Sequence, residues 1–277
     1  MTVQALPGNV RFRAYQLGLQ SVLGTRVDAT RRVPWRFTPT VDPHWTFPDV
    51  DTGTLDPAIA PYRMALDVTG QAAGPLAADD AQILWSGLLM GGVTPTGAVA
   101  KSWHFQPTAT SADPYDPVSG EWGDEVTGDQ FAYIGGIIDQ LQLTFPQDLG
   151  PIQIQADYRY ASVVYPHTRQ NLSVDTSPAW LYGADTALYI NDTAGSIGIT
   201  RMVDTMHDAS ITIASNTDVK RFSNGSNTNF NVSGYGRGAR TLESTFNFAK
   251  STQALQEFAD WLNASPVERF VVLDTTS

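Results

Sequence analysis

Apolar and polar residues alternate along several short segments of the chain, as in strands that bury one face and expose the other. The alternation predicts strands at 137–145, 152–158, 187–190, 197–200, 209–214, 229–233 and 242–248, and an apolar run predicts a last strand at 269–273. Turn-forming residues between segments predict three hairpins, which pair 137–145 with 152–158, 187–190 with 197–200, and 229–233 with 242–248. We therefore expect a mainly β protein.

Two segments have the spacing of amphipathic helices instead. Residues 78–90 begin with acidic residues and end at a glycine pair, which are helix start and stop signals. Residues 251–262 begin at Ser251, a suitable N-cap, and end before Pro266. One face of this second helix carries Leu255, Phe258, Ala259 and Leu262. We expect that face to pack against a sheet.

Proline and aspartate concentrate in three stretches, 39–61, 91–97 and 107–129, which we expect to be loops. The first stretch interleaves five prolines with Trp45 and Phe47. These aromatic side chains are expected to anchor the loop on a neighbouring surface, which another subunit could supply.

Composition limits the classes of partner. The chain has 277 residues, a formal net charge of −11 and no cysteine, which excludes disulfides and thiolate metal sites. The acidic balance argues against affinity for the nucleic-acid backbone. An acidic surface would suit a DNA conduit, but simple solubility is the commoner reason for such a charge. Residues 1–18 lack the features of a signal peptide, and no 18-residue apolar run predicts a membrane helix.

The common signatures of catalytic chemistry are missing from the sequence. It has no phosphate-binding P-loop, no nucleophile elbow and no His-Glu-x-x-His zinc motif. The acidic segments 49–53 and 113–129 lack the calcium-loop pattern, and the glycine-rich 234–238 precedes no helix that could hold a pyrophosphate. Four histidines lack metal-ligand spacing and are expected at the surface or an interface: His44, His104, His167 and His207. We expect no enzyme activity, no catalytic residue, no cofactor and no metal site.

Three segments carry a recognisable order of short patterns. Residues 24–35 read GTRVDATRRVPW, residues 84–93 read LWSGLLMGGV and residues 134–141 read IGGIIDQL. In this order they resemble the major tail proteins that build the tail tube of long-tailed bacteriophages, particularly siphophages of actinobacterial hosts. The resemblance implies a β-sandwich or barrel-like tail-tube fold with flanking α-helices and long loops.

The resemblance also implies an assembly. Chains of this family form rings, six to a ring, that stack into a hollow tube in the virion tail after synthesis in the host cytoplasm. Genomic DNA would pass through the tube without specific binding, other tail proteins would be partners, and no membrane would be involved. One tail-tube domain would span residues 1–277, with long insertions at about 37–62 and 107–129. A faint similarity of 139–144 to 208–213 leaves open an internal duplication, with three chains per ring.

Six residues become candidate inter-subunit contacts under this hypothesis: Arg26, Arg31, Arg32, Trp35, Trp45 and Phe47. A solvated basic loop around one buried tryptophan explains the first four equally well. Two other functions stay open. Seven tryptophans are compatible with a carbohydrate-binding or hydrolysing β-protein of the tail tip, and a capsid or head–tail connector component would also assemble.

Overall fold

The computed structural model describes most of the chain, and the statements below concern that part. The described residues are 13–46, 62–97, 102–105, 115–124, 128–148, 150–191, 198–199, 201–202, 206–221, 231–236, 238–263 and 270–275. Strands make up 54% of the structure and only two α-helices accompany them, so the protein is mainly β, as predicted.

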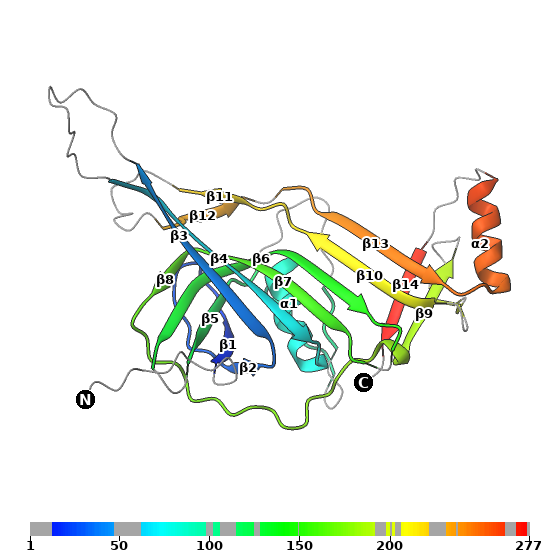
Figure 1. Cartoon of the computed structure of the whole chain (residues 1–277), viewed down its shortest axis with the longest axis horizontal. Coiled ribbons are helices and arrows are strands. Elements are labelled where there is room, and N and C mark those ends of the chain that lie inside the picture. The colour runs from blue at the N-terminus through cyan, green and yellow to red at the C-terminus, as the bar shows by residue number, and fades with distance from the viewer. Residues whose placement is uncertain are drawn as a thin grey trace, which may run out of the picture.

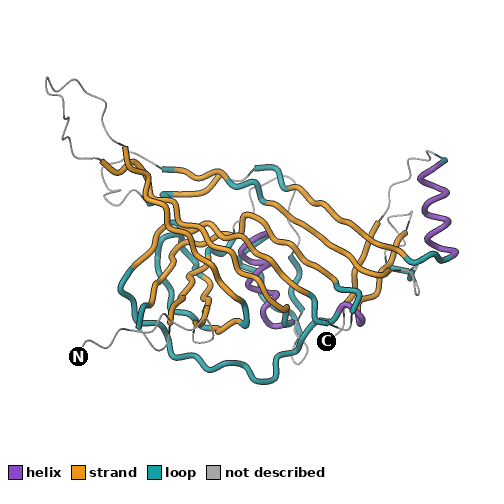
Figure 2. The backbone as a smooth tube through the Cα atoms, in the orientation of Figure 1, coloured by secondary structure: helices purple, strands orange, loops and turns teal. Residues whose placement is uncertain are grey.

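Figures 1 and 2 show the arrangement of these elements. The helices are α1 (Ala78–Leu88) and α2 (Thr252–Leu262). The strands are β1 (Arg13–Leu19), β2 (Arg31–Val33), β3 (Arg36–Thr46), β4 (Tyr62–Pro75), β5 (Val118–Asp124), β6 (Gln130–Phe145), β7 (Gln153–Tyr160), β8 (Ser162–Val164), β9 (Thr186–Asn191), β10 (Met206–Ala214), β11 (Asp218–Lys220), β12 (Gly234–Gly236), β13 (Thr241–Phe248) and β14 (Phe270–Thr275).

Ten strands form one large antiparallel sheet, and the pairs β11–β12 and β9–β14 form two small ones. The order in the large sheet is β2-β1-β5-β6-β7-β4-β3. β6 has 16 residues and changes partners along its length. Its first half pairs with β5 and β8, and its second half pairs with β7 and β10, which in turn pairs with β13. Gly135, with φ of +67°, lies where the partners change, a conformation that favours glycine.

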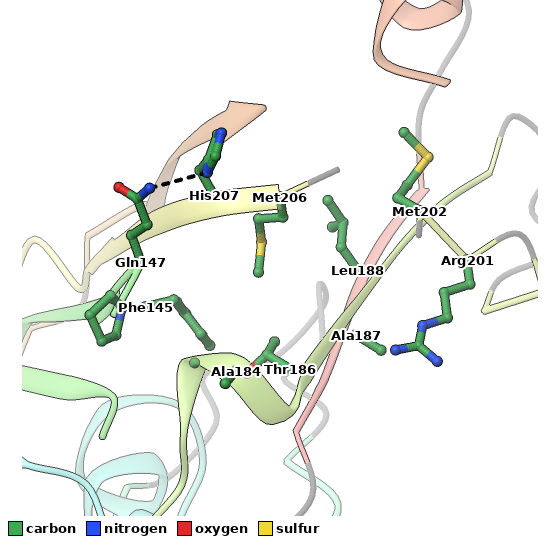
Figure 3. A pocket seen from close by; sticks show the side chains of 12 residues that line it. Phe145, Gln147, Ala184, Thr186, Ala187, Leu188, Arg201, Met202, Met206 and His207 are labelled. Carbon is green, nitrogen blue, oxygen red and sulfur yellow. Dashed lines mark hydrogen bonds between the residues drawn. The ribbon is translucent and has the colours of Figure 1, made fainter. Parts of the chain in front are cut away.

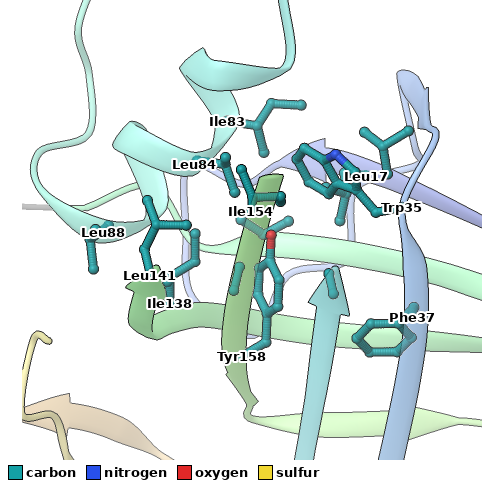
Figure 4. Close-up of a cluster of buried hydrophobic side chains, with 14 of the residues drawn as sticks. Leu17, Trp35, Phe37, Ile83, Leu84, Leu88, Ile138, Leu141, Ile154 and Tyr158 are labelled. Atoms are coloured by element: carbon teal, nitrogen blue, oxygen red, sulfur yellow. The ribbon is translucent and has the colours of Figure 1, made fainter. Parts of the chain in front are cut away.

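The two halves of this sheet face each other across the main hydrophobic core. The ring of Tyr15 on β1 stacks on that of Phe37 on β3, with centroids 4.2 Å apart and planes 3° from parallel. Helix α1 closes one end of the core, where its Leu84 and Leu88 lie beside Ile138 and Leu141 of β6 (Figure 4). Burial of these apolar side chains holds the helix to the sheet.

Four tyrosines are buried in this core, which makes its stability sensitive to alkali. Burial raises the pKa of Tyr15, Tyr133, Tyr158 and Tyr160 above the usual value near 10. Because the folded pKa values exceed the unfolded ones, their stabilisation is complete below about pH 10 and is lost as the pH rises further. We expect the urea midpoint to be constant up to about pH 9 and to fall above about pH 10. Phenolate absorbance from all ten tyrosines of a still folded protein would contradict this.

Most of the predicted elements are confirmed. Segments 137–145 and 152–158 lie in β6 and β7 and form the predicted hairpin. Segments 209–214 and 242–248 lie in β10 and β13, and both predicted helices are present. Ser251 is the N-cap of α2, because its Oγ accepts a hydrogen bond from the backbone N–H of Ala254 at 3.1 Å.

Two predicted loops contain strands instead. Of the stretch 39–61, residues 39–46 belong to β3, and 47–61 lie outside the described residues. Pro39 and Pro43 are tolerated there because β3 is an edge strand, which needs no ladder bonds on its outer side. Of 107–129, residues 118–124 form β5, which lies inside the sheet between β1 and β6.

One predicted strand pairing is wrong, and another is only partly described. β9 contains 187–190 and pairs with β14. Of its predicted partner 197–200 only residues 198–199 are described, both in a turn, and an antiparallel bridge joins Tyr189 to Arg201 just after them. β13 pairs with β10 rather than with 229–233, of which the described residues 231–233 form no strand. The glycine-rich break after them contains β12, which pairs with β11. Alternation marks a strand, but long-range register decides its partner.

The apolar face of α2 also departs from expectation. The helix was predicted to pack that face against a sheet, yet Leu255 and Leu262 are 50% and 64% exposed. The helix stands at the far end of the molecule from the main core, next to β9 and β14 (Figure 1). A monomer therefore shows apolar surface here that ordinary helices bury.

Candidate assembly surface

Six strands of the large sheet, β3-β4-β7-β6-β10-β13, present one continuous polar face. Their registers place alternate residues of neighbouring strands on the same side of the sheet. The other side carries core residues such as Leu141 and Ile154. The same registers place His44, Ala65, Ala73 and Ala214 on the polar face. Its other residues are Arg36, Thr38, Thr40, Asp42, Asp67, Thr69, Gln71, Gln140, Gln142, Thr144, Gln153, Gln155, Asp157, Arg159, Asp208, Ser210, Thr212, Thr241, Glu243, Thr245 and Asn247.

Hydrogen bonds between strands organise the side chains of this face. Gln71 Nε2 donates to Asp157 Oδ1 at 2.8 Å, from β4 to β7. Gln142 Nε2 donates to Ser210 Oγ at 3.1 Å, from β6 to β10. Asn247 Nδ2 donates to Asp208 Oδ1 at 2.6 Å, from β13 to β10. The face is thus a layer of amides, hydroxyls and carboxylates that satisfy one another and water.

The charge of the polar face is negative. Desolvation acts to raise the pKa of Asp67, but hydrogen bonds from His44 and Arg221 outweigh it and lower that pKa. Arg159 Nε lies 2.9 Å from Oδ2 of Asp139, so this cation is also compensated. Within the described part of the chain, no lysine or arginine forms an ion pair with Asp157, Asp208 or Glu243. These carboxylates leave a net acidic surface.

The polar face ends in an edge strand on each side. Among the described strands, β3 pairs only with β4, and β13 pairs only with β10. Each edge also carries exposed apolar side chains: Val41 and Trp45 on β3, and Leu242 and Phe248 on β13. An unpaired edge beside apolar side chains favours pairing with another chain.

Four of the candidate inter-subunit contacts, Arg26, Arg31, Arg32 and Trp35, make contacts within their own chain. Arg26 donates to Oδ1 of Asp28 at 2.7 Å and contacts Nδ1 of His167 at 2.9 Å. Arg31 forms an ion pair with the buried Asp80. Burial raises the pKa of Asp80, although the Arg31 guanidinium acts against this rise.

The remaining candidates differ widely in position. Arg32 Nη1 donates to the carbonyl of Leu172 at 3.4 Å. Trp35 is 4% exposed and donates its indole N–H to the carbonyl of Pro75 at 3.0 Å, so it belongs to the core rather than to a subunit surface. Trp45 is 55% exposed near the end of β3, and Phe47 lies outside the described residues. Of the six, Trp45 is the one that the structure places beside the β3 edge.

A buried carboxylate was missed by sequence analysis. Glu121 on β5 accepts a backbone hydrogen bond from Gln170 at 2.8 Å and lies 3.2 Å from Nε2 of His167. His167, expected at the surface or an interface, has a side chain only 8% exposed within its own chain as a result. Glu121 thereby attaches the segment after β8 to the sheet. No local signal separates it from the exposed acids nearby in the sequence.

Removal of the Glu121 carboxylate is expected to destabilise the protein. In Glu121→Ala the backbone N–H of Gln170 loses its acceptor, so we expect the free energy of unfolding to fall by about 3 kcal/mol. Glu121→Gln keeps the volume and one acceptor oxygen, and should lose roughly half as much. Urea unfolding measures both. A Glu121→Ala variant as stable as the wild type would contradict the role of this residue.

A small pocket lies where the main core meets the far strands (Figure 3). It encloses about 190 Å³ and is lined by residues that include Phe145, Met206 and His207. His207 Nδ1 lies 3.3 Å from Nε2 of Gln147, and the labelled side chains offer no carboxylate. Across the described residues, no three His, Asp or Glu side chains gather into a metal site. We assign the pocket no chemistry.

Comparisons with known proteins give no identification. No protein-family model matches the chain, and no curated protein matches its sequence. No helix in the described part of the chain is long and apolar enough to cross a membrane. Its function is therefore inferred from its own surfaces.

Proposed function

We propose that the protein is a structural virion protein whose chains join into rings and stack into the tail tube of a bacteriophage. Genomic DNA would leave the capsid through this tube. The observation that supports the proposal best is the polar face, which spans six strands and ends in an edge strand on each side. A closed ring of such sheets has no edges left and carries the polar face along its bore or its exterior.

The directions of the six strands favour ring closure. Neighbouring strands from β3 to β13 are all antiparallel, and their number is even. β13 of one chain would therefore run antiparallel to β3 of the next chain related by rotation, which is the commoner kind of pairing. The contact uses different surfaces on the two partners, so it repeats head to tail until the ring closes.

The polar face suits the bore of a DNA conduit. Proteins bind the DNA backbone by neutralising phosphates with lysine and arginine. The defined residues of this face include two arginines, Arg36 and Arg159, and Asp157, Asp208 and Glu243 would repel phosphate. DNA would pass such a wall without sticking to it.

The finer fold assignment belongs to the same proposal. The resemblance to tail-tube proteins implies a sandwich or barrel-like core with a flanking helix and long loops. The folded-over sheet, α1 and the long β3–β4 hairpin support that assignment. On this proposal the protein acts without catalysis, in the tail of the virion, beside other tail proteins.

The glycan-binding alternative has less support. A sugar-binding surface would expose several tryptophans on a concave face. The polar face contains no phenylalanine, tyrosine or tryptophan among its defined residues, and Trp35 is buried in the core. Trp45 is exposed by more than half. We therefore do not propose carbohydrate recognition.

Assembly of the purified protein tests the proposed function. Sedimentation velocity at rising concentration should show a transition from monomers to large assemblies, and negative-stain electron microscopy should show rings or hollow tubes. Monomers at every concentration would contradict the proposal. Closed shells would favour a capsid component instead.

A charge change on the polar face is expected to create DNA binding. The triple variant Gln142→Lys, Gln155→Lys and Thr212→Lys adds three cations to one row across β7, β6 and β10. We expect it to bind short duplex DNA, with log K falling against log salt at a slope of about −3. The matched control is the triple variant Val22→Lys, Ser173→Lys and Val174→Lys, at three exposed positions outside the polar face. Equal DNA binding by both triple variants would contradict a special role for the face.

A further inference from the structure

Two parts of the chain repeat one order of elements. In the first part, β1 and the short β2 are followed by the antiparallel pair β3–β4 and the 11-residue helix α1. In the second part, β9 is followed by the antiparallel pair β10–β13, with β11 and β12 between its strands, and by the 11-residue helix α2. The partner strand of each first element also recurs, because β1 pairs antiparallel with β5, and β9 pairs antiparallel with β14. In both parts that partner follows the helix.

Two pairs of equivalent positions share one spacing, although the starts of the equivalent strands do not. Ala78 and Thr252, the first residues of the two helices, are 174 positions apart. Gly24 and Gly198 are also 174 positions apart, and their φ angles are +81° and +79°. The sequence reads GTRVD from residue 24 and GITRMVD from residue 198. Two independent features, a helix start and a left-handed glycine, thus share one offset.

The repeat differs from the faint similarity noted in the sequence. Segments 139–144 and 208–213 lie in β6 and β10, which are neighbours rather than equivalents. Ile211 of β10 is paired with Leu143 of β6 in an antiparallel ladder. This ladder therefore joins β6, which belongs to the first part, to β10, which belongs to the second part.

The two parts differ in what covers their apolar side chains. We call the exposed apolar side chains of β13 and α2, which are Leu242, Leu255, Phe258 and Leu262, the apolar layer of the second part. At the 174-residue offset, Leu84 and Leu88 of α1 correspond to Phe258 and Leu262 of α2. Leu84 and Leu88 are buried beneath β6, whereas Leu262 is exposed. Leu255 of α2 and Leu242 of β13 are exposed as well. Within the described residues, no strand lies against α2 as closely as β6 lies against α1.

We infer that the chain contains two copies of one structural unit, that the apolar layer of the second unit docks a second copy of this chain, and that three chains close a ring. This inference rests on the proposed function. The β6–β10 ladder is the joint between units within one chain. The same kind of joint between chains would pair β13 with β3 of the next copy, where Val41 and Trp45 bring apolar side chains to Leu242.

The size of the closed sheet supports three chains. Three chains contribute 18 strands to the wall, six from each. With strands about 4.8 Å apart and tilted by about 40°, the backbone radius is about 18 Å. Side chains fill about 5 Å of that radius, which leaves a bore of about 26 Å for a duplex about 20 Å across. Six chains would leave a bore of about 60 Å, far wider than the duplex.

Chemical cross-linking tests the joint and the chain number together. The chain has no cysteine, so Thr40→Cys on β3 and Thr245→Cys on β13 supply the only thiols. Both side chains are exposed. We expect a flexible bismaleimide to convert assembled protein into a covalent ladder that ends at three chains on a denaturing gel. The single variants Thr40→Cys and Thr245→Cys are the matched controls and should give no ladder beyond two chains.

Other outcomes overturn the inference in distinguishable ways. A ladder that ends at six chains would overturn the three-chain ring and leave the β13–β3 joint intact. Rings that electron microscopy still shows, but that give no cross-link, would overturn the joint and leave the proposed function standing. Protein that forms no assembly, in the wild type as in the variants, would contradict the docking surface and the proposed function together.

Discussion

A double variant with aspartate at Leu242 and Leu255 is expected to remain a folded monomer and to lose ring assembly. Leu242 is 68% exposed and Leu255 is half exposed, so the monomer loses little from their replacement. In a ring, each aspartate would be a buried charge without a partner, which costs several kcal/mol. We expect the concentration needed for assembly to rise by roughly 100-fold or more.

Sedimentation velocity measures this effect, and circular dichroism verifies that the monomer is folded. The matched control is Val22→Asp with Val174→Asp, because both valines are more than half exposed and lie outside the docking surface. The control should assemble as the wild type does. Normal assembly of the Leu242→Asp, Leu255→Asp variant would show that the apolar layer of the second unit makes no contact between chains.

Replacement of Phe37 by alanine is expected to give the largest loss of stability. Phe37 is buried, stacks on Tyr15 and lies edge-on to Tyr133 with centroids 5.4 Å apart, so it links the two halves of the folded-over sheet. Gly70 on β4 makes room for it, since a Cβ there would clash with the Phe37 ring. We expect the free energy of unfolding to fall by about 3–5 kcal/mol.

Urea unfolding of Phe37→Ala beside Phe37→Leu measures this contribution. The leucine variant keeps most of the apolar volume and should lose roughly half as much free energy of unfolding as the alanine variant. Because a stable core positions both sheet edges, Phe37→Ala should also assemble less readily. A loss of less than about 1 kcal/mol in Phe37→Ala would contradict the central place of this ring in the core.

The sequence predicted those elements whose pattern depends on local spacing. Alternation in 209–214 and helical spacing in 251–262 are local signals, and both elements formed as expected. β5 was missed because its sequence, VSGEWGD, contains two glycines and two acids. Its Glu121 is buried only because residues far along the chain, Gln170 and His167, supply its hydrogen-bond donors. Such a partner cannot be read from the spacing within a strand.

The candidate surface was only partly accessible from the sequence. Gln140, Gln142 and Gln155 stand at alternate positions of two predicted strands, so their shared side was foreseeable for that hairpin. The extension of this face to β10 depends on a register between residues 64 to 74 positions apart, and its extension to β13 on one between residues 27 to 42 positions apart. Trp35 illustrates the opposite error. Its place beside basic residues suggested a contact segment, whereas its ring fills the core.

Electron cryo-microscopy of the assembled protein tests the central claim most directly, since a cross-section of the tube shows which surface of each chain lines the bore. We predict that the six strands from β3 to β13 form the inner wall, with Gln142, Gln155 and Thr212 directed into the bore. A tube with these side chains on its outer surface, or a bore lined by α2, would contradict the account.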